Sequence, residues 1–299
     1  MASVATTADE RRTDVRALGA ALATVVLWAS AFVGIRSAGH TFSPGALSLG
    51  RLLVAGVALG AIGLSRGERL PSRAQLRQAG LPLLFAGLLW FGAYNLALNA
   101  GERRVDAGTA AMLVNIGPVL IAILAGWLLG EGFPRSLFIG CAIAFAGVVV
   151  IALATANRGA TTTGVLLCVA AAVAYAGGAV AQKVVLRTLT GTQTIFLCCV
   201  IGAAVCLPFA GSLVKQLGSA PGGSIGWLFY LGLAPTALGF STWAYALRRT
   251  DAGRLAATTY LVPPLSILLG WLWLGESPAS LAYLGGALCL AGVAVSRRR

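Results

Sequence analysis

Long apolar stretches, separated by short polar connections, follow one another along the chain from Leu18 to Val295. A helix rises 1.5 Å per residue, so a stretch of about 20 apolar residues can cross a hydrocarbon layer roughly 30 Å thick. The pattern therefore predicts an all-α integral membrane protein with ten transmembrane helices. We expect these helices at residues 17–35, 44–64, 79–100, 105–129, 137–155, 163–183, 192–213, 224–247, 252–274 and 279–296.

The chain also contains an internal repeat with an offset of 145 residues. "DAGTAAMLVNIGPVLIAILAGWLLGE" (106–131) aligns without gaps with "DAGRLAATTYLVPPLSILLGWLWLGE" (251–276), and 10 of the 26 positions are identical. We therefore expect a cytoplasmic tail at 1–16, followed by two five-helix repeats at 17–155 and 160–299. A unit with an odd number of spans ends on the side opposite its start, so the second repeat should be inverted. Inverted repeats are a recurrent transporter design, with the substrate site near the midplane between them.

The ten spans, the duplicated half and the "P…LGE" pattern that ends the fourth and ninth spans are similar to the EamA family of the drug/metabolite transporter superfamily. Within that family, the chain looks closest to YddG-type exporters of aromatic and other amino acids. The resemblance covers nearly the whole chain and is more specific for the fold than for the substrate. It implies alternating access in the bacterial inner membrane, with a small molecule as the partner. Other members of the family move sugars, nucleotide sugars or drugs.

Composition and charge placement agree with this topology. Only 10% of the residues are charged and the mean hydropathy is +0.86, whereas a soluble domain carries about 25% charged residues. If the N-terminus is cytoplasmic, 16 of the 22 Lys and Arg residues fall on the cytoplasmic side, as the positive-inside rule expects. Both termini are then cytoplasmic. The net charge of +13 is therefore explained by basic residues that set the orientation of the chain and contact anionic lipid headgroups. It gives no reason to predict nucleic-acid binding.

Prolines interrupt several of the predicted helices. They are Pro118, Pro235, Pro263 and Pro264. A proline inside a helix cannot bond the carbonyl one turn earlier, and irregular backbone is tolerated in a membrane where it lines a cavity. Asn115 and Tyr260 hold equivalent repeat positions, each three residues before a break. We therefore predict that spans four and nine face each other and form walls of a central cavity. The alternative is a kink that only shapes packing.

Aromatic and amide side chains are the other candidates for the cavity wall. Trp90 and Tyr94 are four residues apart and therefore share a helix face. The complete set of predicted cavity residues is Trp28, Trp90, Tyr94, Asn95, Asn115, Tyr175, Thr236, Phe240, Trp243 and Tyr260. Such walls suit a flat, amphipathic ligand, although interfacial belts and helix packing are commoner roles for one aromatic residue. We expect the belt role for Trp127, Trp271 and Trp273, near the ends of spans.

Charged residues are almost absent from the middle of the spans. No Asp or Glu lies at the centre of a predicted span, which argues against proton-coupled efflux of cationic drugs and favours a facilitator or exchanger. Arg51 is a possible charge site, about 10 Å into span two. We expect its side chain to snorkel to the outer interface. The alternative is that it contacts a substrate carboxylate or caps helix carbonyls.

The sequence gives no indication of catalysis or of a metal or other cofactor. All six cysteines lie within predicted spans and none has a CxxC spacing, so we interpret them as small apolar residues. The single histidine, His40, lies in a loop, and the chain has neither a GxSxG nor an HExxH motif. We therefore expect no catalytic residues and no metal site, and the protein is predicted not to be an enzyme.

The resemblance, with which these observations are compatible, implies an exporter of aromatic and other neutral amino acids. Carbonyls freed near Thr259 and Tyr260 would bind the substrate's ammonium group, and Asn or Thr side chains would bind its carboxylate. A carrier of sugars, other metabolites or a lipid-linked substrate is the alternative, as is drug efflux. Small residues on spans five and ten, among them Gly140, Gly147 and Gly292, allow close packing either within a monomer or in a homodimer.

Overall fold

The computed structural model describes residues 15–101, 103–104, 113–155, 161–274 and 280–298. Regular structure in these ranges is helical, with no strand. Seven helical segments are long and apolar enough to cross a membrane: 15–39, 44–65, 73–101, 162–185, 191–219, 222–247 and 252–273. Three shorter apolar helices, 117–128, 135–151 and 283–296, lie where spans four, five and ten are expected. These helices indicate a multi-pass membrane protein. That the chain crosses the membrane ten times stays a prediction.

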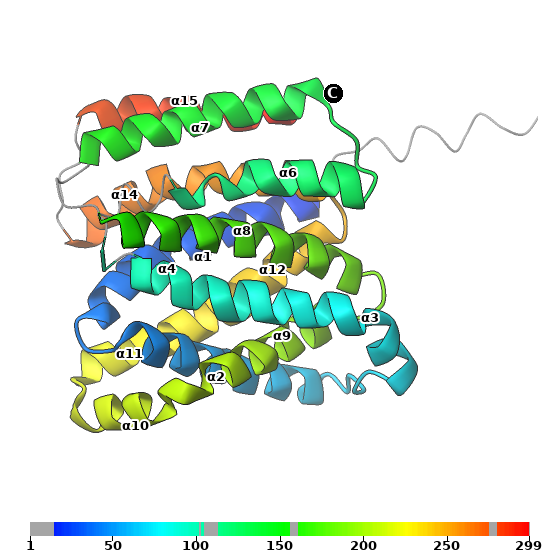
Figure 1. The fold of residues 1–299 in the computed structure, drawn as a ribbon, viewed down its shortest axis with the longest axis vertical. Coiled ribbons are helices and arrows are strands. Elements are labelled where there is room, and N and C mark those ends of the chain that lie inside the picture. The colour runs from blue at the N-terminus through cyan, green and yellow to red at the C-terminus, as the bar shows by residue number, and fades with distance from the viewer. Residues whose placement is uncertain (1–14, 102, 105–112, 156–160, 275–279, 299) are drawn as a thin grey trace, which may run out of the picture.

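The helices run in one common direction, parallel or antiparallel to one another (Figure 1). The first half contains α1 (Val15–Gly39), α2 (Pro44–Ser65), α3 (Arg73–Phe85), η2 (Ala86–Tyr94), α4 (Asn95–Gly101), α6 (Gly117–Leu128) and α7 (Arg135–Thr155). The second half contains α8 (Thr162–Val185), α9 (Gly191–Cys206), η3 (Leu207–Phe209), α10 (Ala210–Ser219), α11 (Gly222–Leu231), η4 (Gly232–Leu238), α12 (Gly239–Leu247), α13 (Ala252–Ala257), η5 (Thr258–Leu261), α14 (Val262–Leu274) and α15 (Ser280–Ser296).

Several helices begin at the residue that their sequence predicts. The Ser43 side chain accepts a hydrogen bond from the N–H of Ala46, and Pro44 occupies the first helical position of α2. Ser72 forms a capping box with Gln75 at the start of α3, and Thr190 forms another at the start of α9. Such caps satisfy N–H groups that have no partner within the helix.

Wide π-helical turns interrupt the third helix of each half, at η2 and at η4. Gly87 of η2 and Gly232 of η4 hold equivalent positions in the two repeats, because they are 145 residues apart in the sequence. Both glycines lie against a neighbouring helix of the other half. A Cβ on Gly87 would come within 2.6 Å of Ile201, and a Cβ on Gly232 within 2.6 Å of Val54. The two wide turns are therefore packed in the same way.

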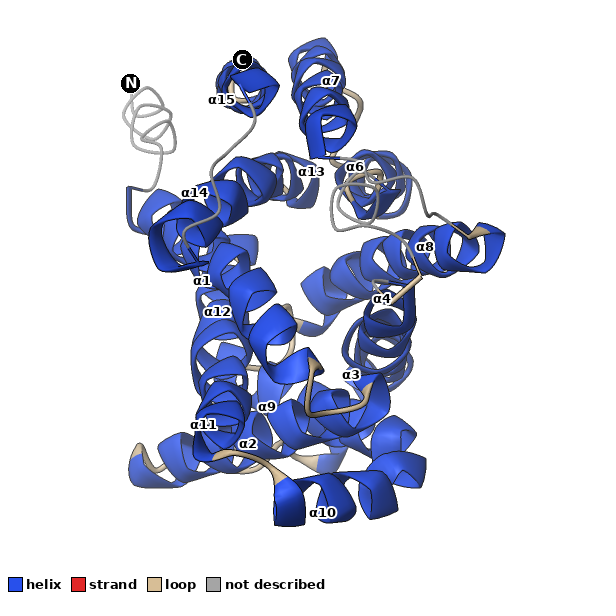
Figure 2. Cartoon of the chain, turned by 90° about the vertical axis from the view of Figure 1, so that its left-hand side faces the viewer, coloured by secondary structure: helices blue, strands red, loops and turns tan. Residues whose placement is uncertain are grey.

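Helices α7 and α15 pack along each other at one end of the molecule (Figures 1 and 2), where they also contact α13, η5 and α14. Gly140 lies against the backbone of Gly292 and Ser296, and Gly147 lies against that of Gly285 and Cys289. The small residues on these two helices therefore form a close contact within one chain. Of the two alternatives that the sequence left open for them, this contact is packing within the monomer.

The prolines of the two matched breaks lie in first turns of helices and not in helix interiors. Pro118 is the second residue of α6, and Pro263 and Pro264 are the second and third residues of α14, which follows the 3-10 turn η5. In the first turn, the missing N–H of proline removes no helical hydrogen bond. The prediction of interrupted helices holds, but each interruption is the beginning of a new helix.

The outer faces of the helices are apolar. Large side chains such as Leu64, Leu166 and Leu290 are exposed at the surface, although water would disfavour them there. Trp127, Trp271 and Trp273 are exposed as well, in contrast to the buried Trp90 and Trp243. Such a surface is suited to lipid contact, while the position of the three exposed tryptophans at a membrane interface stays a prediction.

Candidate functional site

A cavity of about 100 Å³ lies between the two halves, large enough for several water molecules. It is lined by side chains from α1, α2, η2, α4, α6, α8, α12, η5, α14 and the turn before α6. The predicted residues on its wall are Trp28, Arg51, Trp90, Tyr94, Asn95, Asn115, Pro118, Tyr175 and Phe240. Most of the predicted set is therefore brought together at one place.

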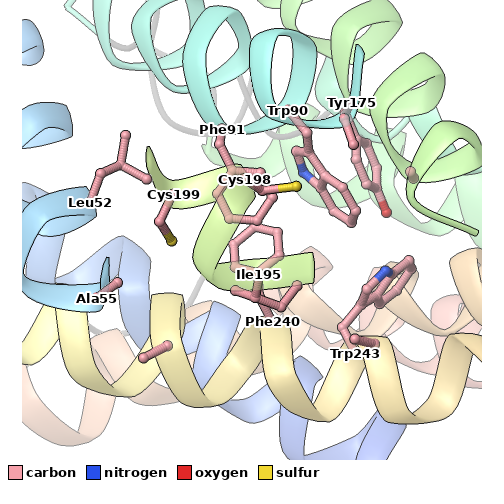
Figure 3. Close-up of a cluster of buried hydrophobic side chains, with 14 of the residues drawn as sticks. Leu52, Ala55, Trp90, Phe91, Tyr175, Ile195, Cys198, Cys199, Phe240 and Trp243 are labelled. Carbon is pink, nitrogen blue, oxygen red and sulfur yellow. The ribbon is translucent and has the colours of Figure 1, made fainter. Parts of the chain in front are cut away.

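Five aromatic rings pack together beside the cavity, and those of Trp28, Trp90, Tyr175 and Phe240 line it. Figure 3 shows the side chains of Trp90, Tyr175, Phe240 and Trp243 within this cluster. The ring of Trp90 contacts those of Trp28, Tyr175, Phe240 and Trp243, with centroids 5.0–5.9 Å apart. Three of these four contacts are edge-to-face. Offset and edge-to-face pairs of this kind are worth about 0.5–1.5 kcal/mol beyond the burial of their surface. The cluster therefore gives the cavity a rigid aromatic wall.

Arg51 lies on the cavity wall, only 7% exposed. The expectation that its side chain snorkels to the outer interface is wrong, since the guanidinium group turns inward between α2 and η4. Its Nε–H donates a hydrogen bond of 3.0 Å to Oγ1 of Thr236. The structure thus places a positive charge at the cavity.

Three predicted residues lie close to the cavity without lining it. Thr236 is buried behind the wall, where it holds Arg51. Trp243 stacks on the outer side of Trp28, with centroids 5.1 Å apart. Tyr260 is 0% exposed and packs with Val25 and other residues in a separate apolar cluster. The expectation that Tyr260 occupies the wall as the counterpart of Asn115 is corrected, because its neighbour Thr259 lines the cavity.

The carbonyl expected to be free at Thr259 is occupied. It accepts a hydrogen bond from the N–H of Val262, because η5 is a tight 3-10 turn. At the other broken span, Asn115 and Pro118 place the N-terminal end of α6 on the wall. The N-terminus of a helix carries partial positive charge. The carbonyl of Thr259 is therefore not the free acceptor that the sequence predicted for an ammonium group.

Pro235 lies inside η4, where the sequence predicts a break. It cannot donate to the carbonyl of Leu231, and the hydroxyl of Thr236 donates to that carbonyl in its place, at 2.7 Å. Asn95 has a related role after η2, where its Nδ2 donates to the carbonyls of Trp90 and Phe91. In lipid, such a side chain compensates for a backbone group that would otherwise be unsatisfied.

The cavity is also lined by residues that the sequence analysis did not predict for its wall. They are Ala31, Phe32, Ile35, Leu98, Val114, Thr259 and Val262. Phe32 could have been found, because it lies four residues after Trp28 and shares its helix face. The others are small or apolar and carry no signal that separates them from residues facing lipid.

Comparisons with known proteins agree with the geometry. Residues 15–153 and residues 162–298 each match the EamA-like transporter family. The chain is 38% identical over 285 residues to a probable terminal-alkyne amino-acid exporter of Streptantibioticus cattleyicolor, covering 95% of this chain and 94% of the relative. It is 26% identical to a probable amino-acid metabolite efflux pump of Escherichia coli, covering 92% and 93%.

A solved crystal structure of a protein with 23% sequence identity has the same fold, with a TM-score of 0.78 over 94% of this chain and 96% of the other. The family matches cover both halves of the chain, and the described helices, the aromatic cavity and the apolar outer surface are those of a membrane transporter. The chain therefore belongs to the EamA-like transporter family, whose members are transporters and not enzymes.

Proposed function

We propose that the protein exports amino acids, aromatic and other neutral ones, by alternating access through the cavity between its halves. The observation that carries this proposal is the aromatic wall formed by Trp28, Trp90, Tyr175 and Phe240, since rings of this kind favour a flat apolar side chain. Two relatives are named as a probable amino-acid exporter and a probable amino-acid metabolite efflux pump, which supports the substrate class.

Contacts between helices support an inverted arrangement of the repeats 17–155 and 160–299. Helix α1 contacts α12, and its repeat counterpart α8 contacts α4, the counterpart of α12. Likewise α2 contacts η4, while α9 contacts η2. These two contacts from the first half to the second thus have counterparts with the halves exchanged. This exchange is what a pseudo-two-fold axis between the repeats requires.

Two contacts join helices at the end of the molecule away from the cavity: Glu131 links the two halves, and Lys183 links α8 to the end of α12 and the turn after it, within the second half. Glu131 accepts hydrogen bonds from the N–H groups of Ala252 and Gly253, at 2.7 and 3.2 Å. Lys183 donates to the carbonyls of Leu247 and Thr250. Lys183 lies eight residues after Tyr175 in α8, which is about 12 Å along the helix. These contacts are those expected of a state closed at this end, as alternating access requires.

We assign this closed end to the cytoplasmic side of the bacterial inner membrane, with both termini cytoplasmic. The assignment rests on the distribution of Lys and Arg along the sequence. Labelling of single cysteines placed after residues 66 and 187 from each side of the membrane tests it. Labelling of both positions from outside the cell would overturn it.

Counterflow in proteoliposomes tests the proposed substrate. Vesicles preloaded with unlabelled phenylalanine should concentrate labelled phenylalanine, tryptophan and leucine, while sugars, a phosphorylated headgroup analogue and a cationic dye should not exchange. A matched variant, Trp90→Ala, should lose most of the exchange of phenylalanine. Exchange of sugars or of the dye without exchange of any amino acid would refute the proposal.

A further inference from the structure

Gln182 is a buried amide without a hydrogen-bond partner among the described residues. Its side chain is 0% exposed, and neither Oε1 nor Nε2 forms a hydrogen bond with any of them. An amide side chain can both donate and accept hydrogen bonds, and leaving such a group unpaired in a protein interior is costly. By contrast, Gln75, Gln193 and Gln216 each form a hydrogen bond with a backbone group. The position of Gln182 therefore requires an explanation beyond packing.

The place of Gln182 in α8 relates it to the cavity. Gln182 follows Tyr175, which lines the cavity, by seven residues. Seven residues make nearly two helical turns, so the two side chains share a helix face, and Gln182 lies about 10 Å closer to the closed end. The next residue, Lys183, donates to the carbonyls of Leu247 and Thr250 at that end. Gln182 therefore lies between the cavity and the closed end, on the face of α8 that lines the cavity.

The aromatic wall lies between Gln182 and the cavity. Trp90 packs onto α8 one turn before Gln182, since a Cβ on Gly178 would come within 2.6 Å of the Cβ of Trp90. A second buried polar group without a partner in the described part of the chain is Nε1 of Trp243, whose ring centroid is 5.5 Å from that of Trp90 (Figure 3). Trp243 is 1% exposed and precedes Leu247 by one turn of α12. Polar groups of α8 and α12 thus lie beyond the wall, toward the closed end.

We propose that Gln182 is a second binding residue for the substrate, and that it lines the path between the cavity and the cytoplasm when the closed end opens. This inference rests on the proposed function, because it takes the substrate to be an amino acid that enters the cavity by this path. The amide suits a zwitterion, since its N–H groups donate to a carboxylate and its oxygen accepts from an ammonium group. In the described state the closed end buries the amide, which accounts for its lack of a partner there.

Transport measured from each side of the membrane tests the binding role. Gln182→Met keeps the length of the side chain and removes its polar atoms. KM for phenylalanine on the cytoplasmic side should therefore rise about tenfold, the loss expected for one hydrogen bond to a charged group. KM on the external side should change far less, because Gln182 does not line the cavity in the described state. An external KM that changes by the same factor, in either direction, overturns the inference, as does an unchanged cytoplasmic KM.

The melting temperature of the same variant separates this role from a structural one. Gln182→Met removes no side-chain hydrogen bond of the described state, so the melting temperature of the purified protein should not fall. Gln78→Met is the matched control, because Gln78 is exposed in α3 and outside the cavity, and neither KM nor the melting temperature should change. A lower melting temperature with an unchanged cytoplasmic KM would assign the amide to the fold alone and would refute the inference.

Cysteine labelling in inside-out vesicles provides the test if Gln182→Met also lowers the melting temperature or does not fold. In a background without native cysteines, Glu131→Ala removes the contact that links the two halves at the closed end, and a polar thiol reagent should then label Gln182→Cys several-fold faster. Val180→Cys is the control, because Val180 is 5% exposed and lies two residues earlier, on the opposite face of α8. Equal labelling rates at the two positions overturn the inference.

Counterflow keeps this inference distinct from the proposed function. If counterflow identifies a substrate that is not an amino acid, the proposed function fails, and KM for that substrate on each side of the membrane still tests Gln182. If amino acids are exchanged but Gln182→Met leaves the cytoplasmic KM unchanged, the proposed function stands and the inference fails. If no substrate is found, the labelling rates at positions 182 and 180 decide whether Gln182 lines the path.

Discussion

The indole ring of Trp28 stacks on that of Trp243, with centroids 5.1 Å apart and an angle of 30° between the planes. Trp28 belongs to the first half of the chain and lines the cavity, whereas Trp243 belongs to the second half and does not. Trp243 therefore supports the wall from behind. The pair also joins α1 to α12, so the shape of the cavity depends on packing that the substrate does not touch.

Removing this support should destabilise the protein. Trp243→Ala leaves a large void at a side chain that is 1% exposed, and such changes cost about 3–5 kcal/mol in a well-packed core. The melting temperature of the purified variant should fall clearly. Trp127→Ala is the control, since Trp127 is 76% exposed and its loss should change the melting temperature little. Equal melting temperatures for the two variants would contradict the packing described.

Adjacent cysteines should distinguish the cavity wall from the apolar cluster behind it. In a background without native cysteines, Thr259→Cys should react with a small polar thiol reagent, because Thr259 lines the cavity. Tyr260→Cys should react slowly, because Tyr260 is buried away from it. Mass spectrometry of the labelled protein measures both rates. Faster labelling at position 260 than at position 259 would be incompatible with the described geometry.

The α7–α15 contact should tolerate no added side chain at its centre. A Cβ on Gly292 would lie 2.4 Å from the backbone nitrogen of Ala144, which the backbone cannot accommodate without moving. Gly292→Ala should therefore lower the yield of folded protein and its melting temperature. In the same helix, Gly286→Ala meets only Pro264, at 3.4 Å, and should behave like the wild type. Gel filtration and thermal unfolding compare the two, and indistinguishable profiles would refute this contact.

Loosening the closed end should favour the opposite state of the transporter. Lys183→Met removes the hydrogen bonds to Leu247 and Thr250, and bonds to a charged group are worth about 1.5–3 kcal/mol. A shift of that size changes the ratio of two states by about tenfold or more. In inside-out vesicles, Asn115→Cys should therefore be labelled several-fold faster when combined with Lys183→Met.

Arg187→Gln serves as the control for that measurement, because Arg187 is exposed one turn beyond Lys183. Its combination with Asn115→Cys should label at the rate of the single variant. If the labelling rate rose equally with Lys183→Met and with Arg187→Gln, the cause would be the loss of a surface charge. That result would exclude a role for the hydrogen bonds from Lys183 to the two carbonyls in closing this end.

The sequence by itself determined the features that depend on local pattern. Apolar length predicted membrane helices, the offset of 145 residues predicted two related halves, and the prolines marked the places where helices are interrupted. It also identified Trp90 and Tyr94 as residues of one face, and both line the cavity. These predictions need only helix geometry and the energetic cost of leaving backbone groups unpaired in lipid.

Only the tertiary structure decided which side chains face the cavity where the helix is irregular. The 3-10 turn η5 has three residues per turn, so it rotates the following residues relative to a regular helix and brings Thr259, and not Tyr260, to the wall. Arg51 is directed inward because Thr236, 185 residues away in the sequence, accepts its hydrogen bond. Both outcomes depend on contacts between distant segments, which a pattern along the chain does not contain.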